Sequence, residues 1–285
     1  MTHTLLIIGL GASGSAAAQA ALGAGFTVSA TARDPSRAAM PGVTIVPFDD
    51  AAPAIAAATH LLMTAPPDEA LGDPALARHA AAIAAAPRLR WIGYISTTGV
   101  YGDRGGAWVD ETTPPAPGQP RSQRRLAAEQ AWAAVARGRA LDLFRTAGIY
   151  GAGRSVFDDL RAGTAQRRLA PGHAFGRIHV EDIGRAIIAA AAQMPPPGVR
   201  VLHLTDDLPA ASADVVTEAA RLLGVPPPPE ESLADAWPRM SPMARSFWSE
   251  NRRLRNDITK AALGIAWRYP TYREGLAAIL QSETI

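Results

Sequence analysis

The sequence predicts an α/β protein with a doubly wound parallel sheet and a small C-terminal α/β cap. Short apolar runs alternate with alanine-rich, helix-like segments through the first two-thirds of the chain, which is typical of β-α-β units. A glycine-rich turn follows the first apolar run, and small, hydroxyl or charged residues follow most of the others. The expected parallel strands lie at 4–9, 27–31, 44–48, 60–64, 90–96 and 141–146.

The alternation loosens in the last third of the chain, which predicts two domains. We expect a sheet domain at 1–150, completed by about 175–205, and a discontinuous substrate cap at 151–285. A strand is expected at 199–205, and helices are expected at 155–163, 214–223 and 271–281. Ligands of such sheets bind at the carboxyl ends of the strands, so functional residues are expected there.

Composition narrows the possible functions. The 285 residues are 48% hydrophobic, so the chain can bury an ordinary core, and it contains no cysteine for disulfides, thiolate metal sites or nucleophilic catalysis. Redox chemistry would therefore need a bound cofactor. A net charge of +2 does not favour a nucleic-acid partner. The apolar runs are too short for a signal peptide or a membrane span, so we expect a cytoplasmic protein without a membrane partner.

The first turn carries a dinucleotide-binding motif. Gly9, Gly11 and Gly14 form GxGxxG between an apolar strand and an alanine-rich helix, with Ala12 and Ser13 at the start of that helix. Such glycines allow a tight turn and bring the backbone close to a pyrophosphate at the positive end of the helix. The motif predicts a Rossmann domain. The alternative is a glycine-rich turn without a ligand.

Residues after the next strands predict the choice of cofactor. Arg33 follows the second strand where an NAD-selective site would present an acidic residue, so it favours NADP(H) over NAD(H) by meeting the 2′-phosphate. A solvated surface arginine is the alternative. Asp49 is a candidate contact to the adenine, and Thr64, Ala65 and Pro66 are candidates along the ribose and pyrophosphate. Both segments are also explained by ordinary turn chemistry.

Several stretches together resemble one superfamily over most of the chain. They are LLIIGLGASG, YISTTGVYGD, WVDETTPPAP, RRLAAEQ, FRTAGIYGAGR, RIHVEDIGRA, ENRRLRND and YPTYREGL. As a set they resemble the extended and atypical branches of the short-chain dehydrogenase/reductase superfamily, which include NAD(P)-dependent epimerases and dehydratases. The resemblance implies nicotinamide-dependent oxidoreductase or epimerase chemistry.

The resemblance also implies roles for residues near the fifth strand. Thr97 falls on the hydroxyl residue that polarises the substrate, with Thr98 beside it, although the cluster could simply cap the strand end. Arg121 and Arg125 fall on the places of the superfamily's catalytic tyrosine and lysine. A guanidinium stays charged and cannot exchange a proton usefully, so Arg121 cannot replace the tyrosine. Arg125 could still contact the nicotinamide ribose and supply positive charge.

A catalytic proton donor must then come from elsewhere. The candidates are Tyr101, Tyr150, Asp103, His179 or water, and we favour Tyr101. Packing, with the hydroxyl bonded to backbone, is the alternative for both tyrosines. No His, Asp and Glu set has a convincing metal-ligand spacing, so no metal is expected.

The substrate is expected to be a small molecule, possibly anionic, and a homodimer is left open. Segment 105–120, with Trp108, resembles a loop over the substrate mouth, and Tyr150 follows the sixth strand. Arg252 and Arg253 belong to an arginine-rich stretch, 245–255, whose spacing places some members on one helical face. The alternative is a solvated helix whose arginines pair with nearby acidic residues.

Two functions remain. The first is an NADP(H)-dependent oxidoreductase or epimerase-like enzyme that lacks the usual Tyr/Lys pair. The second is a non-catalytic NADP(H)-binding sensor or regulatory protein, which the two arginine replacements motivate. A shaped cap and a mouth loop favour the enzyme, because both serve to enclose a small molecule.

Overall fold

A seven-stranded parallel sheet forms the centre of the protein, in a computed structural model that describes residues 3–34 and 38–283. The strand order is β11-β7-β5-β4-β1-β2-β3, so the direction in which successive strands are added to the sheet reverses beside β1. The predicted doubly wound fold is therefore confirmed. The strands are β1 (Thr4–Ile8), β2 (Thr27–Ala32), β3 (Val43–Pro47), β4 (His60–Met63), β5 (Trp91–Thr97), β7 (Ala140–Thr146) and β11 (Gly198–Leu204).

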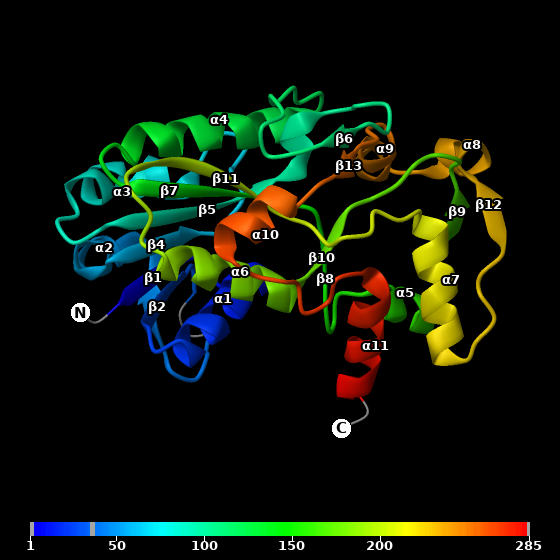
Figure 1. Ribbon diagram of the computed structural model, residues 1–285, viewed down its shortest axis with the longest axis horizontal. Helices are drawn as coiled ribbons and strands as arrows, with labels where there is room; N and C mark the ends of the chain where they lie inside the picture. The colour runs from blue at the N-terminus through cyan, green and yellow to red at the C-terminus, as the bar shows by residue number, and fades with distance from the viewer. Residues whose placement is uncertain (1–2, 35–37, 284–285) are drawn as a thin grey trace.

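Helices cover both faces of this sheet (Figure 1). One face carries α1 (Ala12–Gly23) and α6 (Val180–Ala192), and the other carries α2 (Ala52–Ala57), α3 (Pro74–Ala85) and α4 (Pro120–Val135). Leu5 and Ile7 of β1 point into the first core layer, and Leu6 and Ile8 point into the second. Because both faces are covered, the strands are continuous apolar runs rather than alternating ones.

Most of the remaining elements form a cap beyond the carboxyl ends of the strands, whereas α10 (Asp257–Leu263) packs against α6 and β11 (Figure 1). The cap helices α5, α7 and α11 share a core that includes Phe157, Val215 and Leu276. The other strands and helices are β6 (Trp108–Val109), β8 (Gly148–Tyr150), β9 (Arg167–Leu169), β10 (Arg177–His179), β12 (Glu230–Ser232), β13 (Arg253–Leu254), α5 (Val156–Arg161), α7 (Ser212–Leu223), α8 (Leu233–Ala236), α9 (Pro242–Trp248), α10 (Asp257–Leu263) and α11 (Tyr272–Glu283), with short 3₁₀ helices η2 (Phe48–Asp50), η3 (Thr98–Tyr101) and η4 (Trp237–Arg239). Among these described residues, no helix combines the length and apolar character needed to cross a membrane.

The arginine-rich stretch corrects one expectation. Helix α9 ends at Trp248, and the arginines that follow lie on extended chain, so they do not share a helical face. Strand β13 pairs in parallel with β6 of the mouth loop, where Arg253 is the register partner of Trp108. The backbone N–H and C=O groups of this stretch therefore form hydrogen bonds with the mouth loop and not within a helix.

Helices α1 and α6 cross at a point where only a glycine fits. A Cβ atom added at Gly184 of α6 would lie 2.5 Å from the carbonyl oxygen of Ala16 in α1. Gly23, the last residue of α1, has open space around the same position. The contact between the two helices on this face of the sheet therefore depends on the missing side chain at Gly184.

We expect Gly184→Ala to lower the free energy of unfolding by about 1–3 kcal/mol, because the added methyl must push α6 away from α1. Gly23→Ala is the matched control and should leave stability unchanged or raise it by up to about 1 kcal/mol, since alanine favours helix and meets no atom there. Urea unfolding followed by circular dichroism measures both. Equal effects of the two changes would contradict the packing argument.

Candidate functional site

The glycine-rich turn after β1 is held by one hydroxyl. Gly9 has φ of +100°, a conformation that side chains disfavour, and the hydroxyl of Thr64 donates to its carbonyl oxygen at 2.6 Å. A Cβ atom at Gly14 would lie 2.2 Å from that same oxygen. Gly11, the N-cap of α1, has no side chain to cap the helix, so the first N–H groups of α1 stay available to an anion.

A cavity of about 540 Å³ lies over this turn, at the carboxyl ends of β1, β2 and β4. Six of the predicted cofactor residues line it, namely Gly9, Gly11, Arg33, Thr64, Ala65 and Pro66. Ser13 and Gly14 are buried beneath the turn, and Ala12 lines a neighbouring cavity of about 580 Å³. Most of the residues predicted to bind the cofactor therefore lie on or directly beneath the surface of one cavity.

Asp49 lies apart from this cavity. Its carboxylate is exposed and pairs with Arg78 at 3.3 Å, while Phe48, one residue earlier, lines the hollow. The carboxylate of Asp49 therefore points to solvent and a surface arginine, and a ring takes the place expected for a polar contact. We no longer assign Asp49 to the adenine.

A second cavity, of about 410 Å³, opens where β5 and β7 end. Thr97, Thr98 and Gly99 line it on one side, and residues 146–148 line it on the other. The Thr97 hydroxyl oxygen accepts the Gly99 N–H at 3.1 Å, so it caps η3 as the alternative proposed. Accepting that bond leaves the hydroxyl proton available to a ligand, so capping and substrate contact are compatible.

Arginines of α4 and of the cap give this second cavity a positive lining. Four arginines, Arg121, Arg168, Arg177 and Arg252, face a single carboxylate, that of Glu250. Arg252 donates to Glu250 at 2.9 Å and to the carbonyl oxygen of Gly102 at 2.9 Å. One pair thus neutralises one arginine, and the cavity keeps a net positive charge. The rings of Phe175, Phe247 and Trp248 supply its apolar wall.

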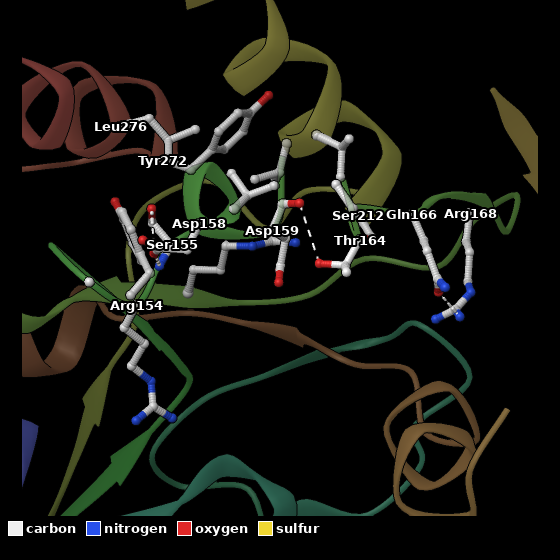
Figure 2. Close-up of a pocket in the computed structure, with 17 residues that line it drawn as sticks. Arg154, Ser155, Asp158, Asp159, Thr164, Gln166, Arg168, Ser212, Tyr272 and Leu276 are labelled. Carbon is white, nitrogen blue, oxygen red and sulfur yellow. Dashed lines mark hydrogen bonds between the residues drawn. The ribbon is translucent and has the colours of Figure 1, made fainter. Parts of the chain in front are cut away.

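A third cavity, of about 710 Å³, continues from the second into the cap. The two share Arg168, Arg177 and Ser212 as lining residues. Figure 2 shows Arg168 beside Gln166 at one end of this cavity, and Tyr272 with Leu276 at the other. A substrate that reaches the end of β5 therefore has room to extend past these shared residues into the cap.

Arg125 is turned toward the sheet. Its guanidinium donates to the carbonyl oxygen of Ile95 at 2.7 Å and to the hydroxyl of Tyr94 at 3.3 Å, and it does not line the second cavity. Arg121 does line that cavity, with its guanidinium 4.0 Å from the centre of the Phe247 ring. Of the two arginines that the resemblance sets in the tyrosine and lysine places, only Arg121 lines the second cavity.

Tyr101 is enclosed in a buried polar network. Arg145 forms an ion pair with Glu129 at 2.8 Å and donates to the Tyr101 hydroxyl at 2.9 Å, while Ser96 donates to Glu129 at 2.5 Å. The Tyr101 hydroxyl lies 2.5 Å from His203. Burial raises the pKa of Tyr101 to about 12. Because the ring has no exposed surface, the structure favours packing over proton donation, and we withdraw Tyr101 as the donor.

The other predicted substrate residues are scattered. Trp108 is half exposed on β6 with Arg255 over its ring, and Arg253 donates to the carbonyl oxygen of Gly106, so neither lines the second cavity. Tyr150 lines the third cavity instead, with its hydroxyl 3.4 Å from the carbonyl oxygen of Thr271. Trp108 and Arg253 therefore stabilise the mouth loop.

Sequence analysis missed several residues that line the cavities. Arg168, Arg177 and Ser212 lie on short cap elements whose position follows from tertiary packing and not from local pattern. Arg177 opens the RIHVED segment, which gave only a family signal. Phe48 precedes Asp49 in the chain. The sequence therefore pointed to the correct segment for the nucleotide cavity but to the neighbouring residue.

No family model matches the sequence. A solved structure from Silicibacter pomeroyi, described as a functionally unknown conserved protein, is 42% identical and covers 100% of both chains, with a TM-score of 0.90. This relative shares the whole architecture at a level of identity that indicates common family membership. Its description assigns no activity.

More distant structures share the fold. MoeE5 in complex with UDP-glucuronic acid and NAD is 20% identical, with a TM-score of 0.79 over 99% of each chain. The human epimerase family protein SDR39U1 (isoform 2) with NADPH is 17% identical, with a TM-score of 0.77 over 98% of this chain and 99% of that one. Similarity at this level of identity shows the fold alone.

One curated relative matches part of the chain. A 3-diazoavenalumate denitrifying reductase from Streptomyces is 34% identical over 99 residues, which are 35% of this chain and 32% of the relative. The match therefore spans about a third of the length of the curated relative.

The buried network generates a stability prediction. Glu129→Gln should lower the free energy of unfolding by about 3–5 kcal/mol, because it leaves the buried Arg145 without a counter-charge. Glu69→Gln is the control, since Glu69 pairs with Arg124 at the surface and its loss should change stability little. Both are measured by urea unfolding, and a Glu129→Gln protein as stable as Glu69→Gln would refute the assignment.

Proposed function

We propose that this chain, which belongs to the family of the Silicibacter pomeroyi protein, is an NADP(H)-dependent oxidoreductase or epimerase-like enzyme of the short-chain dehydrogenase/reductase superfamily. One observation carries the proposal. The nucleotide-sized cavity over the glycine turn and the cavity at Thr97 open along the same edge of the sheet, at the ends of the neighbouring strands β4 and β5. A cofactor bound in the first can therefore present its reactive end to the second.

The chain's residues fit a dinucleotide. A side chain at Gly9 or Gly14 would collide with neighbouring atoms of the turn, so the turn requires glycine at both positions. In addition, no side chain caps the first turn of α1. We propose that these N–H groups bind the pyrophosphate and that Phe48 and Pro66 enclose the adenosine. The nicotinamide supplies hydride chemistry when it is bound.

We propose that Arg33 selects NADP(H). It lines the cavity directly after β2, where the 2′-position of an adenosine ribose is bound in this fold. A guanidinium binds a phosphate through charge-assisted hydrogen bonds, whereas it gains little from a hydroxyl. Among distant structures with this fold, one is solved with NAD and another with NADPH, so the fold accommodates both.

In the second cavity, we assign substrate activation to Thr97. Its hydroxyl accepts from Gly99, which fixes the oxygen at the end of β5 and leaves the proton to polarise a carbonyl. Arg121, in the tyrosine place, stays a cation and would stabilise negative charge that develops on the substrate. Because Tyr101 is enclosed, we propose that protons are exchanged with water in the cavity.

The positive lining favours an anionic substrate. Arg121, Arg168 and Arg177 lack a carboxylate partner among the described ion pairs, while Arg252 is held by Glu250. A small molecule with a carboxylate or phosphate would gain a counter-charge there without a competing internal pair.

A non-catalytic NADP(H) sensor is the second candidate. The placement of Arg121 and Arg125 and the burial of Tyr101 favour it, because none of the three can donate a proton to a ligand in the second cavity. It predicts cofactor binding without turnover, so the two candidates are separated by the assays below.

Arg33→Ala should weaken NADPH binding by about 1–3 kcal/mol, or roughly 5- to 150-fold, and leave NADH binding nearly unchanged. The loss follows from removing the only arginine in the nucleotide cavity's described lining. Isothermal titration calorimetry measures both nucleotides, and Arg78→Ala, which removes an exposed arginine paired with Asp49, is the control. Equal losses for NADPH and NADH would mean that Arg33 does not contact the phosphate.

Thr97→Val should lower kcat on the order of 10²-fold, because it removes a positioned hydrogen-bond donor, and should leave NADPH affinity unchanged. The assay follows loss of NADPH absorbance against aldehydes and ketones that carry a carboxylate or phosphate. Thr112→Val, in the mouth loop, is the control. NADPH binding with no turnover across that panel would favour the sensor, and turnover unaffected by Thr97→Val would remove its assigned role.

A further inference from the structure

Three residues are shared by the second and third cavities and form the junction between them. They are Arg168 on β9, Arg177 on β10 and Ser212, the first residue of α7. Strands β9 and β10 and helix α7 therefore each contribute a polar side chain to the boundary between the two cavities. We call this set the junction.

Arg177 keeps an uncompensated charge at the junction. One of its terminal nitrogens donates to the carbonyl oxygens of Phe175 and Ala210, each at 3.0 Å, which fixes the guanidinium in place. No carboxylate forms an ion pair with it within the described residues, and burial lowers its pKa. A half-buried guanidinium that is fixed in place and has no carboxylate partner is prepared to bind an anion.

The other two residues point to the same ligand. The Nε of Arg168 is buried without a hydrogen-bond partner in the described structure, while its terminal nitrogen donates to Gln166. Ser212 begins a helix of 12 residues whose N-cap, Ala211, has no side chain to satisfy the first N–H groups. Unpartnered donors on both elements thus surround one position.

We propose that the junction is an anion-binding site for a carboxylate or phosphate group of the substrate, and that Asp206, behind Arg177, is a positioning residue that links its occupancy to a proton. This inference rests on the proposed function in one respect, since it takes the two cavities to be the substrate site. Asp158 and Asp159 of α5 also line the third cavity, and their negative charge disfavours an anion along that wall.

The position of Asp206 allows its protonation state to affect anion binding at Arg177. It follows β11, its side chain is fully buried, and neither carboxylate oxygen has a hydrogen-bond partner among the described residues. Its N–H donates to the carbonyl oxygen of Arg177 at 2.6 Å, so the two residues are tied through the backbone. Burial raises the pKa of Asp206 to about 8, against the opposing effect of Arg177.

The sign of the link follows from the charges around the pair. Asp207 raises the pKa of Asp206 further, and Tyr150, Tyr272 and Asp214 face Arg177 from β8, α11 and α7. Below pH 8 Asp206 is neutral, and Arg177 is free to bind an anion. Above pH 8 the ionised carboxylate competes for Arg177 and repels the anion, so affinity falls as the pH rises.

Sulfate and benzoate are suitable probes, because neither changes charge between about pH 6.5 and 9.5. Calorimetric titration of the whole protein should show one sulfate or benzoate site that Arg168→Gln and Arg177→Gln each weaken at least tenfold. Arg221→Gln is the matched control, since this exposed arginine of α7 pairs with Glu218 at the other end of the helix. Tighter sulfate binding would identify a phosphate-type ligand, and tighter benzoate binding a carboxylate.

The same titrations in an Arg33→Ala background remove the arginine of the nucleotide cavity, and the Arg168→Gln and Arg177→Gln variants distinguish the junction from the N-terminus of α1. The affinity should fall up to tenfold per pH unit above pH 8, and Asp206→Asn should remove that dependence and retain the affinity. Binding of neither probe, or binding that Arg168→Gln and Arg177→Gln leave unchanged, would overturn the site. A pH dependence that persists in Asp206→Asn would overturn the link. NADPH titrated separately tests the proposed function, so the two can fail independently.

Discussion

The close approach of Gly14 to the carbonyl oxygen of Gly9 is the contact on which the arrangement of the site depends. It allows α1 to start directly at the end of β1, and the hydroxyl of Thr64 fixes the turn from the neighbouring β4. The helix N-terminus therefore opens at the edge of the sheet where the ends of β2, β4 and β5 also lie. The two cavities and the residues between them are positioned relative to that edge.

The sheet and its turn could be predicted because their signals are local. A run such as Leu5–Ile8, buried on both faces, can be recognised from composition alone, and glycine is required wherever φ is positive, as at Gly9. A strand close to β11 was also predictable, although its first two residues are exposed. The pairing of β13 with β6 was not, because two-residue strands carry no periodicity and their register depends on the folded cap.

Side-chain direction at the ends of strands was the harder part. Asp49 and Tyr101 follow strands as predicted, yet one turns outward to Arg78 and the other inward to Arg145. Both outcomes depend on an arginine distant in the sequence, which no local pattern identifies. The opposite holds for Arg168 and Arg177. A charged residue on a short strand is expected at the surface, yet the folded cap places both of them along a cavity.

The pairing of β6 with β13 has a consequence for assembly. Residues 108–109 are synthesised well before their strand partner at 253–254, which lies about 145 residues further along the chain. The central sheet can form while later parts of the cap are still being synthesised, whereas the mouth loop cannot pair until residues 253–254 have been made. During that interval Arg121, Arg168 and Arg177 are already made but the aromatic wall at 247–248 is not, so the nascent chain presents an open, unfinished pocket.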